Sequence, residues 1–248
     1  MTGQSMWLEA YWQAIAKLQK EVIGSQVEAL GAVAALMIET IQAECRIFLF
    51  GTGHSHMLAE EGHFRAGGLA PFVPILFSSV MLHEGTILSG QVERTPGLAG
   101  PVLDSYSPQA GEMIIIFSNS GVNQMPVEMA LAAKERAMSV VSVTSIAYSK
   151  IAPLSSIGQR LHEIADFAID NCIPPGDALL AVEGFAGRVA PASTLIGSLI
   201  LNGLVAEVAG RLGQAGQEIP AFVSANMPGA AEHNRRLLEK WRGRNPHI

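Results

Sequence analysis

Residues 48–61 read FLFGTGHSHMLAEE, and residues 115–129 read IIFSNSGVNQMPVEM. Each stretch passes from an apolar segment through a turn rich in Gly, Ser, Thr and Asn into a helical pattern. Parallel strands gather such turns at their carboxyl ends, where the free N–H groups of the following helix favour phosphate. We therefore expect one shared anion pocket. The simpler interpretation is that Ser55, Ser118 and Ser120 only cap helices, and the presence of two such turns makes it the weaker one.

The remaining apolar segments define the fold class. Short β-branched runs alternate with helical patterns, which indicates a parallel sheet covered by helices on both faces. The chain is therefore predicted to be α/β, a three-layer α/β/α sandwich with a five-stranded parallel sheet. The expected strands are 46–50, 72–77, 113–117, 139–144 and 167–170.

The N-terminal region is expected to be helical. Apolar residues recur every three or four positions over residues 7–44, and Gly24 and Gly31 in the middle leave open whether this is one helix or two. We assign residues 1–45 to a helical segment that packs on the core or at a dimer interface. Residues 46–248 form the main domain.

Composition excludes several classes of protein. The 248 residues are 49% hydrophobic and 15% charged, and 16 Lys and Arg against 22 Asp and Glu leave a net charge of −6. These values exclude a disordered chain and a disulfide-stapled miniprotein, and they offer no basic surface for nucleic acid or anionic membranes. The low charged fraction favours a homo-oligomer. The N-terminus lacks an export signal and the apolar stretches 66–82 and 189–206 contain Pro or polar residues, so we expect a cytoplasmic protein without membrane spans.

Neither turn is a nucleotide-binding loop. No Gly-Lys-Ser/Thr follows, as a Walker loop requires, and Met57 and Leu58 stand where G-x-G-x-x-G would place its third Gly. The expected ligand is therefore a phosphate that is not part of a nucleotide, and no cofactor is expected.

These residues resemble the sugar isomerase (SIS) domain superfamily from about Leu8 to Arg242. Within that superfamily, the sequence is most similar to a bacterial branch described only as phosphosugar-binding proteins. This branch is related to N-acetylmuramic acid 6-phosphate etherases and sedoheptulose 7-phosphate isomerases. The stretches that carry it are GTGHS (51–55), HSHMLAEEGHFRAGG (54–68), MLHEG (81–85), FSNSG (117–121), AAKERAMSVVSVTS (132–145), SANMPG (224–229) and EHNRR (232–236).

The resemblance implies a flavodoxin-like SIS fold that binds a phosphorylated sugar, in a homodimer or homotetramer with sites near subunit boundaries. It implies that the second turn holds the phosphate and that the first turn meets the sugar or phosphate. Ser193 and Thr194 resemble the Ser-Thr of the etherases and offer hydroxyls from a third helix. The substrate-binding residues expected in this way are Thr52, Gly53, Ser55, Ser118, Asn119, Ser120, Asn123, Ser193 and Thr194.

The sequence also departs from its relatives. The metal-binding His and Glu of the heptulose isomerases correspond to Glu61 and Arg65, and Arg cannot be a metal ligand. The catalytic His and Glu of those isomerases fall among residues 199–202, which cannot transfer protons. We therefore expect no metal, and that isomerase mechanism does not carry over.

Acid–base chemistry is left to a few other residues. Glu84 is the first candidate for a base, beside His83, and His54 flanks Ser55 in the first turn. Each of the three also has a structural interpretation, as a salt bridge, a cap or a packing residue. The expected function is isomerisation of, or elimination from, an amino or N-acyl sugar phosphate by general acid–base chemistry. The alternative is a noncatalytic sensor of the same ligand.

Two further segments leave alternatives open. The Pro-Pro-Gly-Asp sequence at residues 174–177 is a turn that fits part of a lid. Residues 233–244 carry five basic residues against one acidic residue, and they form either a solvated tail or an arm that reaches a neighbouring site.

Overall fold

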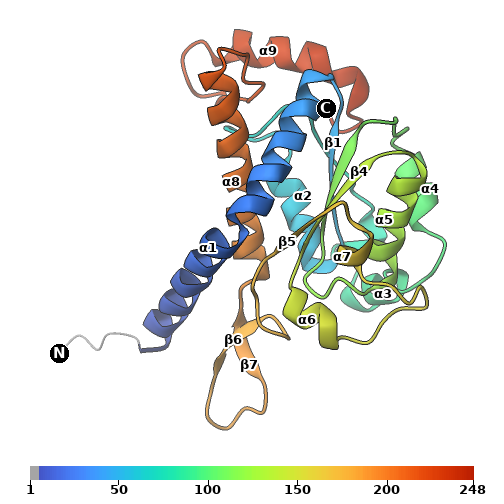
Figure 1. Ribbon diagram of the computed structural model, residues 1–248, viewed down its shortest axis with the longest axis vertical. Helices are drawn as coiled ribbons and strands as arrows, with labels where there is room; N and C mark the ends of the chain where they lie inside the picture. The colour runs from blue at the N-terminus through green and yellow to red at the C-terminus, as the bar shows by residue number, and fades with distance from the viewer. Residues whose placement is uncertain (1–5) are drawn as a thin grey trace.

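A five-stranded parallel sheet forms the centre of the molecule in the computed structural model, which describes residues 6–248 (Figure 1). Its strand order is β2-β1-β3-β4-β5, and the predicted α/β fold class is confirmed. The sequence predicted β3, β4 and β5 at their observed bounds, whereas β1 begins and ends one residue later and β2 is shorter than expected. The strands are β1 (Ile47–Gly51), β2 (Phe72–Pro74), β3 (Met113–Phe117), β4 (Ser139–Thr144) and β5 (Phe167–Asp170).

Helices cover both faces of this sheet, because alternate side chains of each strand point to opposite faces. Leu49 and Ile115 belong to one hydrophobic cluster, while Phe48 and Ile114 belong to the other. The first cluster packs under α1 (Met6–Gln42), α2 (His56–Gly62) and α8 (Ser193–Gln214). The second packs under α4 (Ala99–Asp104), α5 (Gln124–Glu135) and α7 (Leu161–Ile164).

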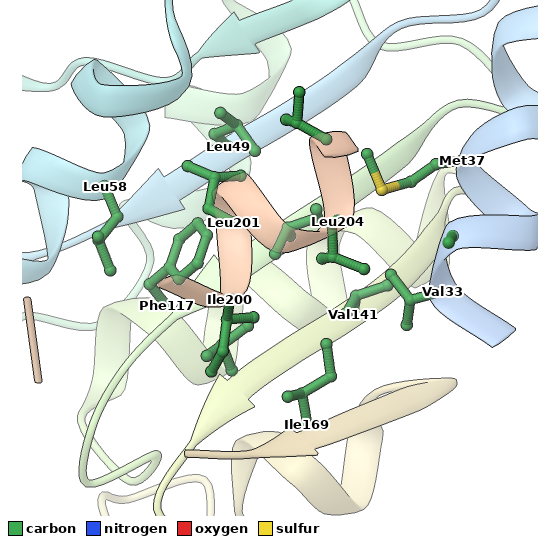
Figure 2. Packing of buried hydrophobic residues seen from close by; sticks show 14 of the residues in the cluster. Val33, Met37, Leu49, Leu58, Phe117, Val141, Ile169, Ile200, Leu201 and Leu204 are labelled. Atoms are coloured by element: carbon green, nitrogen blue, oxygen red, sulfur yellow. The ribbon is translucent and has the colours of Figure 1, made fainter. Parts of the chain in front are cut away.

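Helix α8 lies in the middle of the first cluster. Figure 2 shows Leu201 and Leu204 between the sheet and α1, where Met37 meets them. α1 and α8 are both apolar and long enough to pass a length-and-hydropathy test for a membrane span. α8 is apolar because it is a core helix, with many of its side chains buried against the sheet and α1.

Helix α1 is one continuous helix of 37 residues, so the two-helix alternative is wrong. Gly24 and Gly31 lie within it, because packing of α1 against α8 outweighs the low helix propensity of glycine. Its first half extends beyond the body of the molecule, next to a projecting hairpin of β6 (Ala178–Ala181) and β7 (Arg188–Pro191) (Figure 1).

The two long connections carry secondary structure of their own. The segment between β2 and β3 contains η2 (Ser78–Val80), α3 (Thr86–Val92) and α4, and the segment after β5 contains the hairpin. Short η1 (Gly53–Ser55) and α6 (Ile146–Ile151) follow β1 and β4. Both long connections contribute to the site described below.

The basic C-terminal segment folds back onto its own chain. It folds as α9 (Ala230–Trp241) and η3 (Arg242–Arg244), and Leu237 and Trp241 are buried against Ala70 and Phe222. The His233 ring contacts the carbonyl oxygen of Ala221 at 2.8 Å. The amphipathic pattern of the helix thus serves to dock the C-terminus on its own chain.

Candidate functional site

The two Ser-rich turns lie side by side at the carboxyl edge of the sheet. Gly51 pairs with Phe117 in register, so the turns that follow β1 and β3 begin next to each other. They open on a cavity of about 400 Å³, within the size range of small-molecule sites. The lining residues are Thr52, Gly53, His54, Ser55, Glu93, Ser118, Asn119, Ser120, Asn123, Tyr148, Gly176 and Asp177.

Two glycines are required by the close packing of these turns. A Cβ on Gly51 would lie 2.4 Å from the carbonyl oxygen of Ser55, so only Gly lets the first turn fold back on β1. Gly121 has φ +62°, and a Cβ there would lie 2.6 Å from Thr144 Oγ1. The Gly121 N–H in turn donates to Ser118 Oγ at 3.2 Å, which closes the second turn.

Asn119 is held from two neighbouring strands. Its carbonyl oxygen accepts from the Ser145 N–H at 3.0 Å, and its Oδ1 accepts from Asn171 Nδ2 at 2.9 Å. Its own Nδ2 is buried and has no hydrogen-bond partner within residues 6–248. A buried amide donor without an acceptor is costly, and Asn119 is one of the residues that line the cavity.

The polar wall of the cavity is built from neutral donors. Helix α5 begins beside the second turn, and its N-cap residue, Asn123, makes no side-chain capping hydrogen bond. Met125 donates its N–H to the carbonyl oxygen of Glu93 at 2.9 Å and Pro126 has no N–H, so this helix start contributes mainly its dipole to the cavity mouth. Serine hydroxyls, amide groups and a helix N-terminus together suit a phosphate group.

Two carboxylates also line the cavity. The Thr52 hydroxyl donates to Glu93 Oε1, and Arg94 lies 3.6 Å from Glu93 Oε2. Glu93 directly follows the last residue of α3, and its side chain is only 15% exposed. Sequence reasoning missed it, because nothing in the local pattern around residue 93 distinguishes it from a surface acid.

The other carboxylate, Asp177, caps α8. Its Oδ1 accepts from the N–H groups of Ala192 and Ser193 at 3.0 and 2.8 Å, and its Oδ2 accepts from Ser193 Oγ at 2.7 Å. Asp177 thus occupies the place at this helix N-terminus where an anion would bind. The Pro-Pro-Gly-Asp turn had pointed to this edge of the sheet, but the cap itself depends on tertiary structure.

This cap changes the surroundings of the two hydroxyls expected at the third helix. Ser193 is engaged by Asp177, and both Ser193 and Thr194 line a neighbouring cavity of about 540 Å³ instead of the first one. His54 and Asp177 line both cavities. The exposed His54 ring therefore lies where the two spaces meet.

The remaining catalytic candidates lie elsewhere. Glu84 accepts hydrogen bonds from the hydroxyls of Ser78 and Ser79, and it is not among the residues that line the two cavities. His83 does not line them either, and its ring packs edge-on against His56 with 5.1 Å between ring centroids. Of the two carboxylates that line the cavity between the turns, Asp177 caps α8, which leaves Glu93 as the candidate for proton transfer.

The positions that correspond to the metal ligands of the heptulose isomerases do not fit a metal. Glu61 forms an ion pair with Arg65 and accepts a hydrogen bond of 2.9 Å from Asn202 Nδ2 on α8. An arginine has no lone pair to donate, and the one carboxylate present already has two partners.

Histidines away from the cavity titrate differently from free imidazole. Burial, and secondarily the charge of His247, lowers the pKa of His63, and burial lowers the pKa of His247. Their rings lie with centroids 6.0 Å apart, and the His247 ring contacts the Tyr106 hydroxyl at 2.9 Å. Burial raises the pKa of that Tyr106 hydroxyl. This cluster is structural in character.

Comparison with known proteins agrees with this architecture. The family profile described as SIS domain matches residues 10–145. A UPF0309 protein of Brucella canis is 45% identical over 215 residues, which cover 87% of this chain and 88% of that protein, and a UPF0309 protein of Brucella melitensis matches equally well.

Solved structures show the same fold at low identity. The phosphoheptose isomerase GmhA from Neisseria gonorrhoeae has a TM-score of 0.53 and 18% identity, covering 84% of this chain and 97% of that one. The sugar isomerase domain of an RpiR transcription factor from Sphaerobacter thermophilus has a TM-score of 0.51 and 16% identity, covering 97% of this chain and 99% of that one. By family profile and by close relatives, the chain belongs to the SIS domain family and, within it, to the UPF0309 proteins.

Proposed function

We propose that the protein binds a phosphorylated sugar in the cavity between the two turns. The observation that carries this proposal is the convergence of Ser55, Ser118, Ser120 and Asn119 on one space, with the amide donor of Asn119 left without a partner. The ester phosphate would take the second turn and the N-terminus of α5. The sugar would extend toward His54 and the neighbouring cavity.

Binding is tested by placing a negative charge at Asn119, whose Nδ2 has no hydrogen-bond partner in the described residues, with a side chain of the same shape. Asn119→Asp keeps an oxygen for Asn171 but replaces the free N–H₂ by a negative charge, so sugar phosphates and inorganic phosphate should bind at least tenfold more weakly. Thermal-shift and calorimetric titrations measure this. Asn226→Asp, in the exposed segment before α9, is the matched control and should bind like the parent protein. Equal affinity of all three proteins would refute the proposal.

We further propose that the bound sugar, an amino or N-acyl sugar phosphate, is isomerised or undergoes elimination. Glu93 is placed to remove a proton from the carbon next to a carbonyl, and His54 is placed to give a proton to oxygen. In an isomerisation the second hydroxyl of the enediol gives its proton back to His54 as the new carbonyl forms, and Glu93 returns its proton to the neighbouring carbon. In an elimination the electrons of the broken C–H bond form the C=C bond as the leaving group, protonated by His54, departs. The Thr52 hydroxyl orients the Glu93 carboxylate for this role.

A noncatalytic sensor remains the second candidate. The specific observation in its favour is that Glu61 bonds to both Arg65 and Asn202 at positions that correspond to the machinery of the isomerases. A turnover assay across sugar phosphates that bind separates the two. A bound ligand recovered unchanged after long incubation supports the sensor, and conversion that disappears in Glu93→Gln supports the enzyme.

We also propose that the protein is a homo-oligomer assembled through α1. Trp7, Trp12, Ile23 and Val27 are each at least 48% exposed on this helix. Ile23 and Val27 line an apolar groove of about 280 Å³ shared by α1 and α8. A second copy of α1 has the apolar surface to cover this groove, and burial of such a patch is the expected driving force.

A further inference from the structure

In the described part of the chain, one lone pair of the His56 ring has no partner. Its ring is 3% exposed, and its Nδ1 contacts the carbonyl oxygen of Gly53. A carbonyl can only accept, so Nδ1 carries the proton and Nε2 keeps its lone pair. Nε2 is buried and has no hydrogen-bond partner within residues 6–248. Such an atom calls for a donor or a cation.

Two more ligand-type groups converge on this nitrogen. Glu60 follows one turn later on α2, and its Oε1 lies 3.9 Å from His56 Nε2. His83 comes from the segment between η2 and α3, and its Nε2 lies 3.8 Å from the same Glu60 oxygen. The three atoms all lie within 4.8 Å of one another. Neither Glu60 contact is short enough for a hydrogen bond, so the groups face a common point without satisfying each other.

We propose that His56, Glu60 and His83 bind one divalent transition-metal ion, with Zn²⁺ as the ion that fits their chemistry. Two imidazoles and one carboxylate form a ligand set found in zinc sites, and three protein ligands leave a position for water or ligand. Ligand atoms about 2.0 Å from a tetrahedral ion lie about 3.3 Å apart. The side chains of Glu60 and His83 are 45% and 60% exposed, so small rotations close the remaining gap.

The proposed site is separate from the positions discussed for the heptulose isomerases. Glu60 and Glu61 are adjacent, but Glu61 is directed to Arg65 and to Asn202 of α8, whereas Glu60 is directed to the two histidines. None of the three ligands lines the 400 Å³ cavity between the two Ser-rich turns. The His56 contact to Gly53 links the ion to the first turn, so the metal would pin the segment around His83 to that turn.

Zn²⁺ binding is the direct test. Tag-free, full-length protein is stripped with a chelator and then titrated with Zn²⁺ in competition with a chromophoric chelator, in buffer without phosphate or sugar phosphate. One equivalent per chain is expected. His83→Ala and Glu60→Gln change exposed side chains and should each weaken binding at least tenfold, while their circular dichroism spectra remain those of the parent protein.

Glu61→Gln is the matched control, because it changes the neighbouring carboxylate on the same helix. It should bind Zn²⁺ like the parent protein. Co²⁺ as a spectroscopic probe should give visible d–d bands in the parent protein and in Glu61→Gln that are lost in His83→Ala. The proposal is overturned if the parent binds less than one equivalent, if His83→Ala and Glu60→Gln bind normally, or if Glu61→Gln loses the ion equally. None of these results depends on sugar binding.

Discussion

Thr52 donates its hydroxyl hydrogen bond to Glu93, which ties the first Ser-rich turn to the C-terminal end of α3. The two residues are 41 positions apart in sequence. The bond joins a turn expected to hold the ligand to a carboxylate that local sequence patterns did not identify. It makes Glu93, rather than Glu84, the carboxylate to test for proton transfer.

Glu93→Gln should abolish most turnover while leaving substrate affinity nearly unchanged. Removal of a general base costs about 10²–10⁴-fold in rate, and Gln is close in shape to Glu. Steady-state kinetics and calorimetric titration with the same sugar phosphate provide the measurement. Glu84→Gln serves as the comparison and should retain the rate. Loss of turnover in Glu84→Gln alone would contradict this assignment and restore Glu84 as the base.

Gly121→Ala should destabilise the protein by about 1–3 kcal/mol. The residue has φ +62° and its new Cβ would lie 2.6 Å from Thr144 Oγ1. Gly24→Ala is the matched control, since nothing lies within 4 Å of its Cβ in the middle of α1. That change should stabilise by about 0.5–1 kcal/mol. Urea unfolding of both variants measures the difference, and effects of the same sign would argue against the described second turn.

Glu112→Gln should destabilise the fold by about 3–5 kcal/mol, because it leaves a buried guanidinium without its counter-ion. Glu112 is fully buried and pairs with Arg46 through contacts of 2.5 and 2.8 Å at the amino ends of β3 and β1. Glu232→Gln breaks an exposed pair with Arg235 instead and should cost far less, because solvent screens that pair. Chemical denaturation gives both values, and a similar small loss for Glu112→Gln would show that the Arg46 charge is not buried.

Trp12→Asp should lower the mass of the native particle. Trp12 is 62% exposed on α1, and a buried charge in an apolar interface is strongly unfavourable. Light scattering coupled to size-exclusion chromatography measures the mass over a range of concentrations. Gln13→Asp adds a charge at a neighbouring exposed polar position and should keep the mass of the parent protein. An unchanged mass for Trp12→Asp would exclude this face of α1 as the contact.

Stability should fall as the pH drops below about 6.5, the ordinary histidine value. Burial lowers the pKa of His63 and of His247 in the folded chain, so the unfolded chain binds protons first. The loss therefore begins near the unfolded pKa and continues until the folded pKa values are passed. Urea midpoints at pH 7.5 and 5.5 measure it. The double variant His63→Gln and His247→Gln should show a shallower dependence, and an identical slope would contradict this origin.

Much of the fold follows from local patterns. The apolar runs that became β3, β4 and β5 were bounded correctly, because buried parallel strands are continuous in sequence and end at turn residues. The predicted second strand, 72–77, gave only the short β2 (Phe72–Pro74), although the Ile75 N–H still donates to the carbonyl oxygen of Leu49 at 2.9 Å just beyond it. The two glycines in α1 did not break the helix, because packing on α8 overrides propensity.

The residues of the candidate site were likewise predictable only in part. Ser55, Ser118, Asn119 and Ser120 were recognisable because each follows a strand directly, and the parallel pairing of β1 with β3 then brings the turns together. The sequence did not reveal the contacts made by Glu93, by Asp177 and between His56 and His83. The partners in these contacts are distant in sequence, and the surrounding residues carry no periodic signal.

Short-range pattern thus specified the strand–turn–helix units, the parallel sheet and the polar turns, because backbone geometry and apolar periodicity act over a few residues. Folding in three dimensions chose which carboxylate faces the cavity, which hydroxyl is consumed by a helix cap and which histidine nitrogen is left free. Those choices depend on contacts between segments tens of residues apart, and such contacts exist only once the sheet has assembled its connections around one edge.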